Sequence, residues 1–155
     1  MKNPAATGRL RGAGLRVTKQ RLAVLNVLDR AQSGHEHLTV AVIAERARSQ
    51  LGSMSTQTVY DCVDALTKSG LLRAIEPAGH PTRFEVRFED SHHHLVCRSC
   101  GRIVDVDGVI GADPCLAPSA ASGFLVEATE VTFWGFCPSC TPQPTPVSIH
   151  REVHQ

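Results

Sequence analysis

Two Cys-x-x-Cys pairs frame the second half of this 155-residue chain: Cys97 with Cys100, and Cys137 with Cys140. Each pair places two thiolates on one tight turn, where both can lie about 2.3 Å from a shared Zn²⁺ ion. Two such pairs complete a tetrahedral site. We therefore predict a structural Cys₄ zinc site that ties a central strand to a C-terminal one, in a reducing compartment and in place of disulfides.

Three consecutive histidines, His92, His93 and His94, precede the first pair. On a strand, side chains alternate between faces, so His92 and His94 would point the same way and His93 the other. Two imidazoles beside a carboxylate suit Fe²⁺, Mn²⁺ or Zn²⁺, which predicts a second metal site. The alternative is that these residues form a solvated polar hinge without a metal. The nearby carboxylates are Glu85, Glu89, Asp90, Asp105 and Asp107.

The formal net charge of +1 hides two halves of opposite sign. Residues 1–84 carry 12 Lys and Arg against 6 Asp and Glu, whereas residues 85–155 carry 4 against 9. A basic half favours nucleic acid as a partner, and the acidic, metal-ligating half favours regulation. There is no apolar run of membrane-spanning length and no secretory signal pattern, so we expect a cytoplasmic protein without a membrane partner.

The order of elements predicts a winged helix-turn-helix followed by a second, smaller domain. Residues 1–14 are glycine-rich and basic, and we expect a flexible arm. Helices are predicted over 17–31, 40–49 and 56–69, with Thr18, Thr39 and Ser55 as N-caps and Gly34, Gly52 and Gly70 at the ends. Strands are predicted over 71–75 and 82–88, then over 94–97, 102–106 and 125–136, with an irregular stretch at 109–122.

The third predicted helix would be the one that reads DNA, because its first turns offer polar side chains to base edges. Basic residues near the first helix suit phosphates. The predicted DNA-binding residues are Arg16, Lys19, Arg21, Ser55, Thr56, Gln57 and Tyr60. Cys62 is expected in the core and Cys115 is a candidate for redox chemistry, while His35 and His80 have no partner that the sequence identifies.

Several segments together resemble the ferric-uptake-regulator family. They are Gly14 to Arg21 (GLRVTKQR), Ser55 to Tyr60 (STQTVY), His92 to Gly101 (HHHLVCRSCG) and Ile103 to Asp105 (IVD). Within the family, Asp113 to Leu116 (DPCL) and Val131 to Cys140 (VTFWGFCPSC) resemble the actinobacterial regulators paired with catalase or catalase-peroxidase genes. The resemblance covers about residues 14–141.

The resemblance implies an α+β homodimer: a winged-helix DNA-binding domain over 15–84, a hinge over 85–91, a small α/β dimerisation domain with the Cys₄ zinc over 92–141, and a disordered tail over 142–155. It implies one regulatory-metal ligand from the DNA-binding domain, one from the hinge and three from the second domain. Carried over by position, the ligands are His37, Glu85, His92, His94 and Asp105. Glu89 and Asp90 remain alternatives for the hinge ligand.

Aspartate at position 105 resembles the peroxide-sensing members of the family. That resemblance implies a repressor that binds palindromic operator DNA with Fe²⁺ or Mn²⁺ in the regulatory site and is released when hydrogen peroxide oxidises a ligand histidine, His37 or His92. Two departures stand out: Asp61 replaces an arginine common in the family, which alters the expected operator. Some members have a further metal site that uses a histidine in the final strand region; here Glu127 to Glu130 contains none, so we expect that site to be absent or altered.

Other interpretations keep part of this evidence. The same fold could act as a thiol–disulfide switch through Cys115 or the four paired cysteines, or as a plain iron, manganese or zinc sensor. A non-regulatory zinc-ribbon module would use the Cys₄ site alone. A zinc enzyme is the most distant interpretation, because the chain lacks His-Glu-x-x-His and the zinc-deaminase pattern His-x-Glu…Pro-Cys-x-x-Cys. We therefore expect no enzyme and no small-molecule substrate other than hydrogen peroxide.

Overall fold

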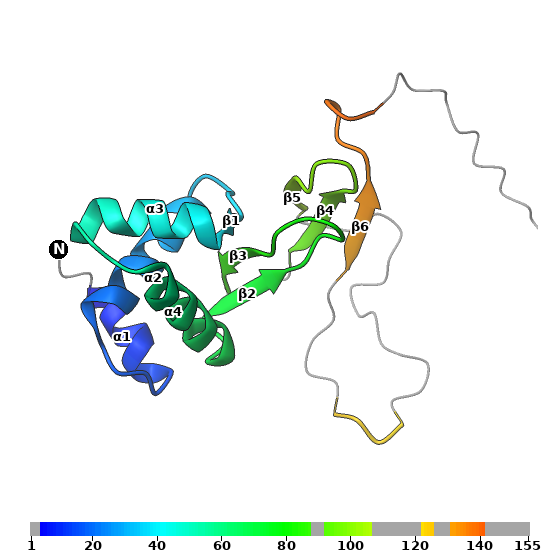
Figure 1. Ribbon diagram of the computed structural model, residues 1–155. Helices are drawn as coiled ribbons and strands as arrows, with labels where there is room; N and C mark the ends of the chain where they lie inside the picture. Colours follow the sequence, from blue (N-terminus) through cyan, green and yellow to red (C-terminus); the bar gives the residue numbers. More distant parts are fainter. Residues whose placement is uncertain (1–3, 88–91, 107–121, 126–130, 142–155) are drawn as a thin grey trace, which may run out of the picture.

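The computed structural model describes residues 4–87, 92–106, 122–125 and 131–141. Figure 1 shows a helical N-terminal domain on one side and a small sheet of three strands on the other. The hairpin of β2 (Leu72–Ile75) and β3 (Arg83–Val86) reaches from the first to the second. Among the described residues, no helix is both long and apolar enough to cross a membrane.

The three helices predicted for the N-terminal domain are confirmed. They are α2 (Lys19–Gln32), α3 (Val40–Leu51) and α4 (Thr56–Lys68). Each begins after the predicted cap, whose side-chain oxygen accepts a hydrogen bond from the backbone N–H three residues on; the caps are Thr18, Thr39 and Ser55. Capping satisfies one of the amide groups that the first helical turn leaves without an intrahelical partner.

The flexible arm expected over residues 1–14 is wrong for most of its length. Pro4–Gly12 forms a helix, α1, whose Ala6 and Leu10 are fully buried against the other helices. Arg9 on the same helix makes a two-pronged ion pair with Asp29 of α2. Tertiary packing therefore outweighs the low helix propensity of the glycines in this segment.

The wing is an antiparallel sheet with strand order β1-β3-β2. The strands β2 (Leu72–Ile75) and β3 (Arg83–Val86) lie inside the predicted ranges, whereas the two-residue strand β1 (Leu38–Thr39) was not predicted. The register places Arg73 opposite Glu85. Glu85 thus belongs to a wing strand, which corrects its assignment to the beginning of a hinge; residues 88–91 lie outside the described part.

The second sheet has the order β5-β4-β6, with β4 antiparallel to β5 and parallel to β6. Its strands are β4 (His93–Cys97), β5 (Ile103–Val106) and β6 (Thr132–Gly135). Of the strand expected over 125–136, Thr132–Gly135 is strand, residues 125, 131 and 136 are not, and residues 126–130 lie outside the described part. The irregular stretch at 109–122 and the tail at 142–155 fall almost wholly outside the described residues.

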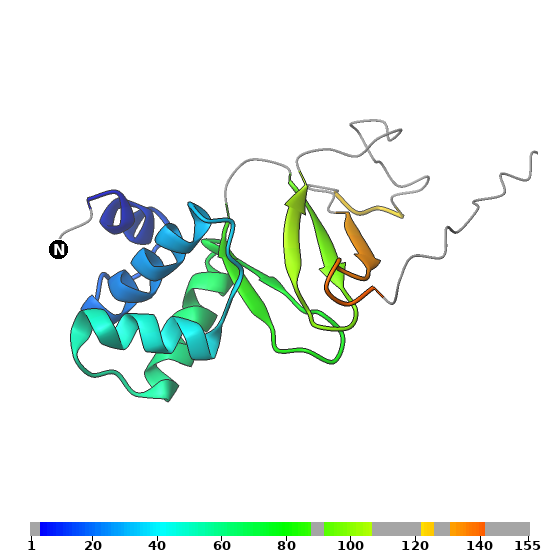
Figure 2. The same cartoon turned by 90° about the horizontal axis from the view of Figure 1, so that it is seen from above.

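The two domains also touch at the tip of the wing. Figure 2 shows the β2–β3 hairpin lying alongside the second sheet. Ile75 of β2 is buried in one cluster with Val96 and Ile103 of that sheet. Beyond it, the ring of His80 lies over Gly101, and its Nε2 is 3.4 Å from the carbonyl oxygen of Arg98. The wing therefore packs against the turn that carries the first cysteine pair.

Candidate functional site

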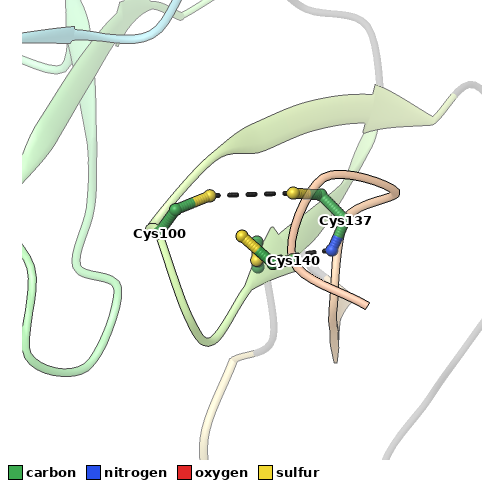
Figure 3. Close-up of side chains that lie close together, drawn as sticks. Cys100, Cys137 and Cys140 are labelled. Atoms are coloured by element: carbon green, nitrogen blue, oxygen red, sulfur yellow. Dashed lines mark hydrogen bonds between the residues drawn. The ribbon is translucent and has the colours of Figure 1, made fainter. Parts of the chain in front are cut away.

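The four paired cysteines meet at one point, as their spacing predicted. Their Sγ atoms all lie within 4.8 Å of one another. Figure 3 shows Cys100 and Cys137 facing each other, with 3.7 Å between the sulfurs. Sulfurs bound to one tetrahedral Zn²⁺ at about 2.3 Å are about 3.8 Å apart, so this separation fits shared metal ligation. It is far from the roughly 2 Å of a disulfide, and all four are free thiols.

The electrostatics of this cluster also favour a cation. Backbone N–H groups of Cys137 and Cys100 lower the pKa of Cys97 to about 6, and the first of these donates to its Sγ at 3.3 Å. Although Ser99 acts to lower the pKa of Cys140, the sulfurs of Cys137 and Cys100 raise it to about 12. Four thiolates this close need a neutralising ion, and Zn²⁺ matches both ligand type and geometry.

A second cluster joins the two domains. Ligand atoms of His37, Glu85, His94 and Asp105 lie within 4.8 Å of one another. Nε2 of His37 is 2.9 Å from a carboxylate oxygen of Glu85 and 2.9 Å from one of Asp105. Two N or O ligands that bind one ion at about 2.1 Å and at a right angle are about 3 Å apart, so these distances fit a bound metal.

Each of the four residues comes from a different place in the fold. His37 precedes β1, and Glu85 lies on β3, so both belong to the N-terminal domain. His94 on β4 and Asp105 on β5 are cross-strand partners in the second sheet. The cluster therefore exists only while the two domains are held together.

The cluster is buried and charged. The side chains of His37, Glu85 and His94 are at most 3% exposed, and that of Asp105 is 10% exposed. Burial acts to raise the pKa of Glu85, but hydrogen bonds and charges from His37 and His94 outweigh it and hold that pKa well below its usual range. Oδ1 of Asp105 is buried and has no well-directed hydrogen bond among the described residues, although Nε2 of His37 lies 2.9 Å from it. Such atoms, with mixed N and O donors, fit Fe²⁺, Mn²⁺ or Zn²⁺.

His92 lies at the border of this cluster and is not one of its four members. Its Nε2 is 3.2 Å from Glu85 Oε1 and 4.0 Å from Asp105 Oδ1, and its ring centroid is 5.0 Å from that of His94. The predicted alternation along the strand is consistent with this placement, because His93 contributes no atom to the cluster. Glu89, Asp90 and Cys115 lie outside the described residues.

The predicted DNA-reading face is exposed. Ser55, Thr56, Gln57 and Tyr60 all lie at the surface of the first turns of α4, and Tyr60 is 54% exposed. Three of them also make hydrogen bonds within the protein. Ser55 caps the helix, Thr56 Oγ1 accepts a hydrogen bond from Arg48 at 2.8 Å, and Gln57 Nε2 donates to Asp61 Oδ1 at 2.8 Å.

The predicted phosphate-binding residues gather at the start of α2. Arg16 and Lys19 are exposed there, and Arg21 donates to the carbonyl oxygen of Arg16 at 2.9 Å. Cys62 is buried in the core as expected, and its burial raises the pKa of its thiol.

The sequence did not predict the contacts of three residues that lie beside the cysteine cluster or the cluster of His37, Glu85, His94 and Asp105. Arg73 Nη1 lies 3.3 Å from Glu85 Oε1, and His35 Nδ1 lies 3.2 Å from Asp105 Oδ2. His80 packs on Gly101. The Arg73 pairing followed in principle from the hairpin register, whereas the two histidine contacts cross between domains and had no local signal.

Comparisons with known proteins agree with this architecture. The model of the ferric uptake regulator family matches residues 12–114. The transcriptional regulator FurA of Mycobacterium tuberculosis is 46% identical over 142 residues, 92% of this chain and 94% of that protein. The peroxide operon regulator of Bacillus subtilis is 30% identical over 133 residues, 85% and 88% of the two chains.

A solved structure of the Helicobacter pylori ferric uptake regulator has the same fold, with a TM-score of 0.68, 23% identity and coverage of 90% of this chain and 97% of that one. The predicted α+β class, with a helical winged domain followed by a domain with a four-cysteine cluster, is confirmed. The interpretation as a zinc enzyme is excluded, because the matched family and relatives are transcriptional regulators. This chain belongs to the ferric uptake regulator family.

Proposed function

We propose that this protein is a metal-dependent repressor that binds palindromic operator DNA as a homodimer and is released by hydrogen peroxide. The observation that carries the proposal is the buried cluster of His37, Glu85, His94 and Asp105, which draws two residues from each domain. Family membership supports the coarser statement that the chain is a metal-dependent transcriptional regulator acting on DNA in the cytoplasm.

The cluster offers a direct route from metal binding to DNA binding. An ion held by both domains favours one relative orientation of them, and in a dimer that orientation sets the distance between the two α4 helices. Operator half-sites lie about one DNA turn apart, so only some orientations place both helices in the major groove. Coupling between two sites in a protein is typically about 1–3 kcal/mol, enough to change DNA affinity roughly 5- to 150-fold.

We assign the contacts with DNA to two groups of residues. Gln57 and Tyr60, on the exposed turns of α4, would face base edges together with Ser55 and Thr56. Arg16, Lys19 and Arg21 would bind phosphates and supply affinity without sequence preference. The basic N-terminal half is consistent with this division.

The peroxide response rests on the donor set and on similarity to the peroxide operon regulator of Bacillus subtilis. When bound, Fe²⁺ supplies the one-electron chemistry that activates hydrogen peroxide. His37 and His92 contribute the imidazole that is oxidised: one C–H carbon of the ring gains an oxygen atom, and the second peroxide oxygen leaves as water. An oxidised ring is a poorer metal ligand, so the metal ion would no longer hold the two domains in one orientation. Zn²⁺ on the four cysteines would be structural and would stay in place.

The test is DNA binding by zinc-loaded full-length protein with Mn²⁺ or Fe²⁺ added, before and after hydrogen peroxide. We expect Mn²⁺ to confer tight, peroxide-resistant binding and Fe²⁺ to confer binding that peroxide abolishes. His37→Ala should lose the metal response, whereas His93→Ala, which changes a neighbouring histidine outside the cluster, should keep it. Full metal-dependent affinity in His37→Ala would refute the regulatory site.

Mass spectrometry of the peroxide-treated iron form separates the proposal from a thiol switch. One added oxygen on His37 or His92 supports the proposal. The lowered pKa of Cys97 is the observation that favours the alternative, since a thiolate reacts readily once zinc is gone. Disulfides among the four cysteines with release of zinc, and no change in the histidines, would establish the thiol switch instead.

A further inference from the structure

The end of helix α2 has an unusual residue in its terminal turn. Glu36 N–H donates to Ala31 O and His35 N–H donates to Gln32 O, which is the hydrogen-bond pair of a Schellman motif. The residue in the left-handed conformation of that motif is normally glycine. Here it is His35, with φ of +52°, although Gly34 stands one position earlier.

A left-handed conformation costs an ordinary residue about 1–2 kcal/mol, and histidine is among the side chains found there more often than most. Strain of this kind is frequently retained where a side chain is needed in a particular place.

The His35 ring reaches across to the other domain and contacts the regulatory cluster from outside. Its Nδ1 lies 3.2 Å from Oδ2 of Asp105, while Oδ1 of the same carboxylate lies 2.9 Å from Nε2 of His37. One carboxylate thus has its inner oxygen on the buried cluster and its outer oxygen on His35. The ring itself is 76% exposed, whereas Asp105 is only 10% exposed.

We infer that His35 is a positioning residue for the regulatory metal site: it holds Oδ2 of Asp105, so that Oδ1 stays directed at the ion. The inference rests on the regulatory site proposed above. His35 is not a ligand itself, because its Nδ1 meets the outer oxygen and contributes no atom to the cluster. Hydrogen-bond partners behind a ligand orient it, and losing one typically weakens metal affinity about 10- to 100-fold.

The position of His35 makes it suitable for mutation. His35 and His37 both line an open pocket of about 300 Å³, together with Glu36, Arg46 and Arg83. Changing an exposed side chain at the rim of a pocket leaves no hole in the core, so variants are expected to fold. The hydrogen bond also joins the two domains, because His35 follows α2 and Asp105 lies on β5.

Two substitutions separate the side chain from the backbone conformation. His35→Gly removes the hydrogen bond and relieves the left-handed strain. His35→Asn tolerates the same φ and places an amide N–H donor where Nδ1 stands, since both nitrogens are bonded directly to Cγ. If His35 has a purely structural role, His35→Gly should leave both the unfolding temperature and the Mn²⁺ affinity unchanged or raise them. If His35 is a positioning residue, the same substitution should keep or raise the unfolding temperature but lower the Mn²⁺ affinity.

The experiment is calorimetric titration of zinc-loaded, full-length protein with Mn²⁺, combined with thermal unfolding of the manganese-free form. We expect His35→Gly to bind Mn²⁺ about tenfold more weakly, while its manganese-free form unfolds at the wild-type temperature or above it. His35→Asn should recover most of the affinity. Zinc content should be unchanged in both variants.

His37→Ala in the same titration separates a failure of the positioning role of His35 from a failure of the regulatory metal site. If His37→Ala abolishes binding but His35→Gly binds Mn²⁺ like the wild type, the positioning role is wrong and the regulatory site stands. If His37→Ala also binds Mn²⁺ normally, the regulatory site itself is misassigned. Weak binding by His35→Asn equal to that of His35→Gly would likewise overturn the hydrogen-bond explanation.

Discussion

At the scale of the residue, Glu85 is a buried carboxylate that lies among four basic side chains. Its carboxylate is 2% exposed and lies within 3.4 Å of side-chain nitrogens of Arg73, His37, His92 and His94. A buried charge of this kind is stable only because it is surrounded by partners. The same arrangement makes Glu85 sensitive to protonation.

Glu85 should make the metal-free protein sensitive to acid. Because its pKa in the folded state lies well below the ordinary 4.5, folding favours the ionised form. That contribution is fully present above the ordinary pKa of the unfolded chain and is lost progressively as the pH falls below it. We expect wild-type protein to lose stability between about pH 5 and pH 3, and Glu85→Gln to lose less over the same interval. Urea unfolding at several pH values measures both; equal pH dependence would contradict the assignment.

Individual site residues differed in how well the sequence predicted them. The pairing of His92 with His94 followed from strand alternation, and the meeting of the four cysteines followed from their spacing. The contact of His35 with Asp105 did not, because the two residues are 70 positions apart and join different domains. Local patterns carry no information about which surfaces will later face each other.

At the scale of the element, the wing has a second role besides its place beside α4. Its tip packs on the turn that runs from Cys97 to Gly101, and Gly101 has a left-handed φ of +69°. A Cβ built on Gly101 would lie 2.7 Å from Cγ and 2.9 Å from Cβ of His80. The absence of a side chain at position 101 therefore allows the two domains to approach.

Gly101→Ala should separate the wing from this turn. We expect a loss of about 1–2 kcal/mol from the left-handed backbone and a further loss of about 1–3 kcal/mol from the clash with His80. In a His80→Gly background the second part should disappear, which a double-mutant cycle of unfolding free energies measures. Strictly additive effects of the two substitutions would show that the contact is absent in solution.

The elements missed from the sequence, α1 and β1, share a physical reason. The segment Pro4–Gly12 is short and has a glycine, Gly8, in its interior, and it is helical because Ala6 and Leu10 pack onto α2 and its neighbours. The two-residue strand β1 is too short for a periodic pattern and exists because Leu38 pairs with Phe84 of β3. The capped helices α2, α3 and α4 were predictable because their signals are local.

At the scale of the whole molecule, the two domains have very different cores. Among the described residues, the N-terminal cluster contains 20 buried residues and the second contains only Ile75, Val96 and Ile103. One of these three residues, Ile75, belongs to the wing and not to the second domain. The described part of the second domain thus buries little apolar surface of its own, and a structural zinc site contributes roughly 10–16 kcal/mol in small zinc-binding peptides.

Cys97→Ser should therefore affect the second domain and spare the first. Cys97 is buried at the end of β4, and its sulfur accepts the N–H of Cys137, which follows β6. We expect loss of bound zinc and of the dimer, while the helical signal of the N-terminal domain persists. Zinc content, sedimentation and circular dichroism measure these three properties. A stable dimer with unaltered zinc would contradict a structural role for the Cys₄ site.

By itself, the sequence determined the elements and chemical groups whose information is local: three capped helices, the two longer strands of the wing, the strands of the second sheet, four cysteines with zinc spacing, and the pair His92 and His94. Only the tertiary structure decided what lies across the boundary between the domains. It placed His37 and Glu85 against His94 and Asp105, a set that the family resemblance had implied but no local pattern had, and it brought His35 behind Asp105 and His80 against Gly101. These contacts depend on burial and on the approach of distant surfaces, which no spacing along one chain specifies.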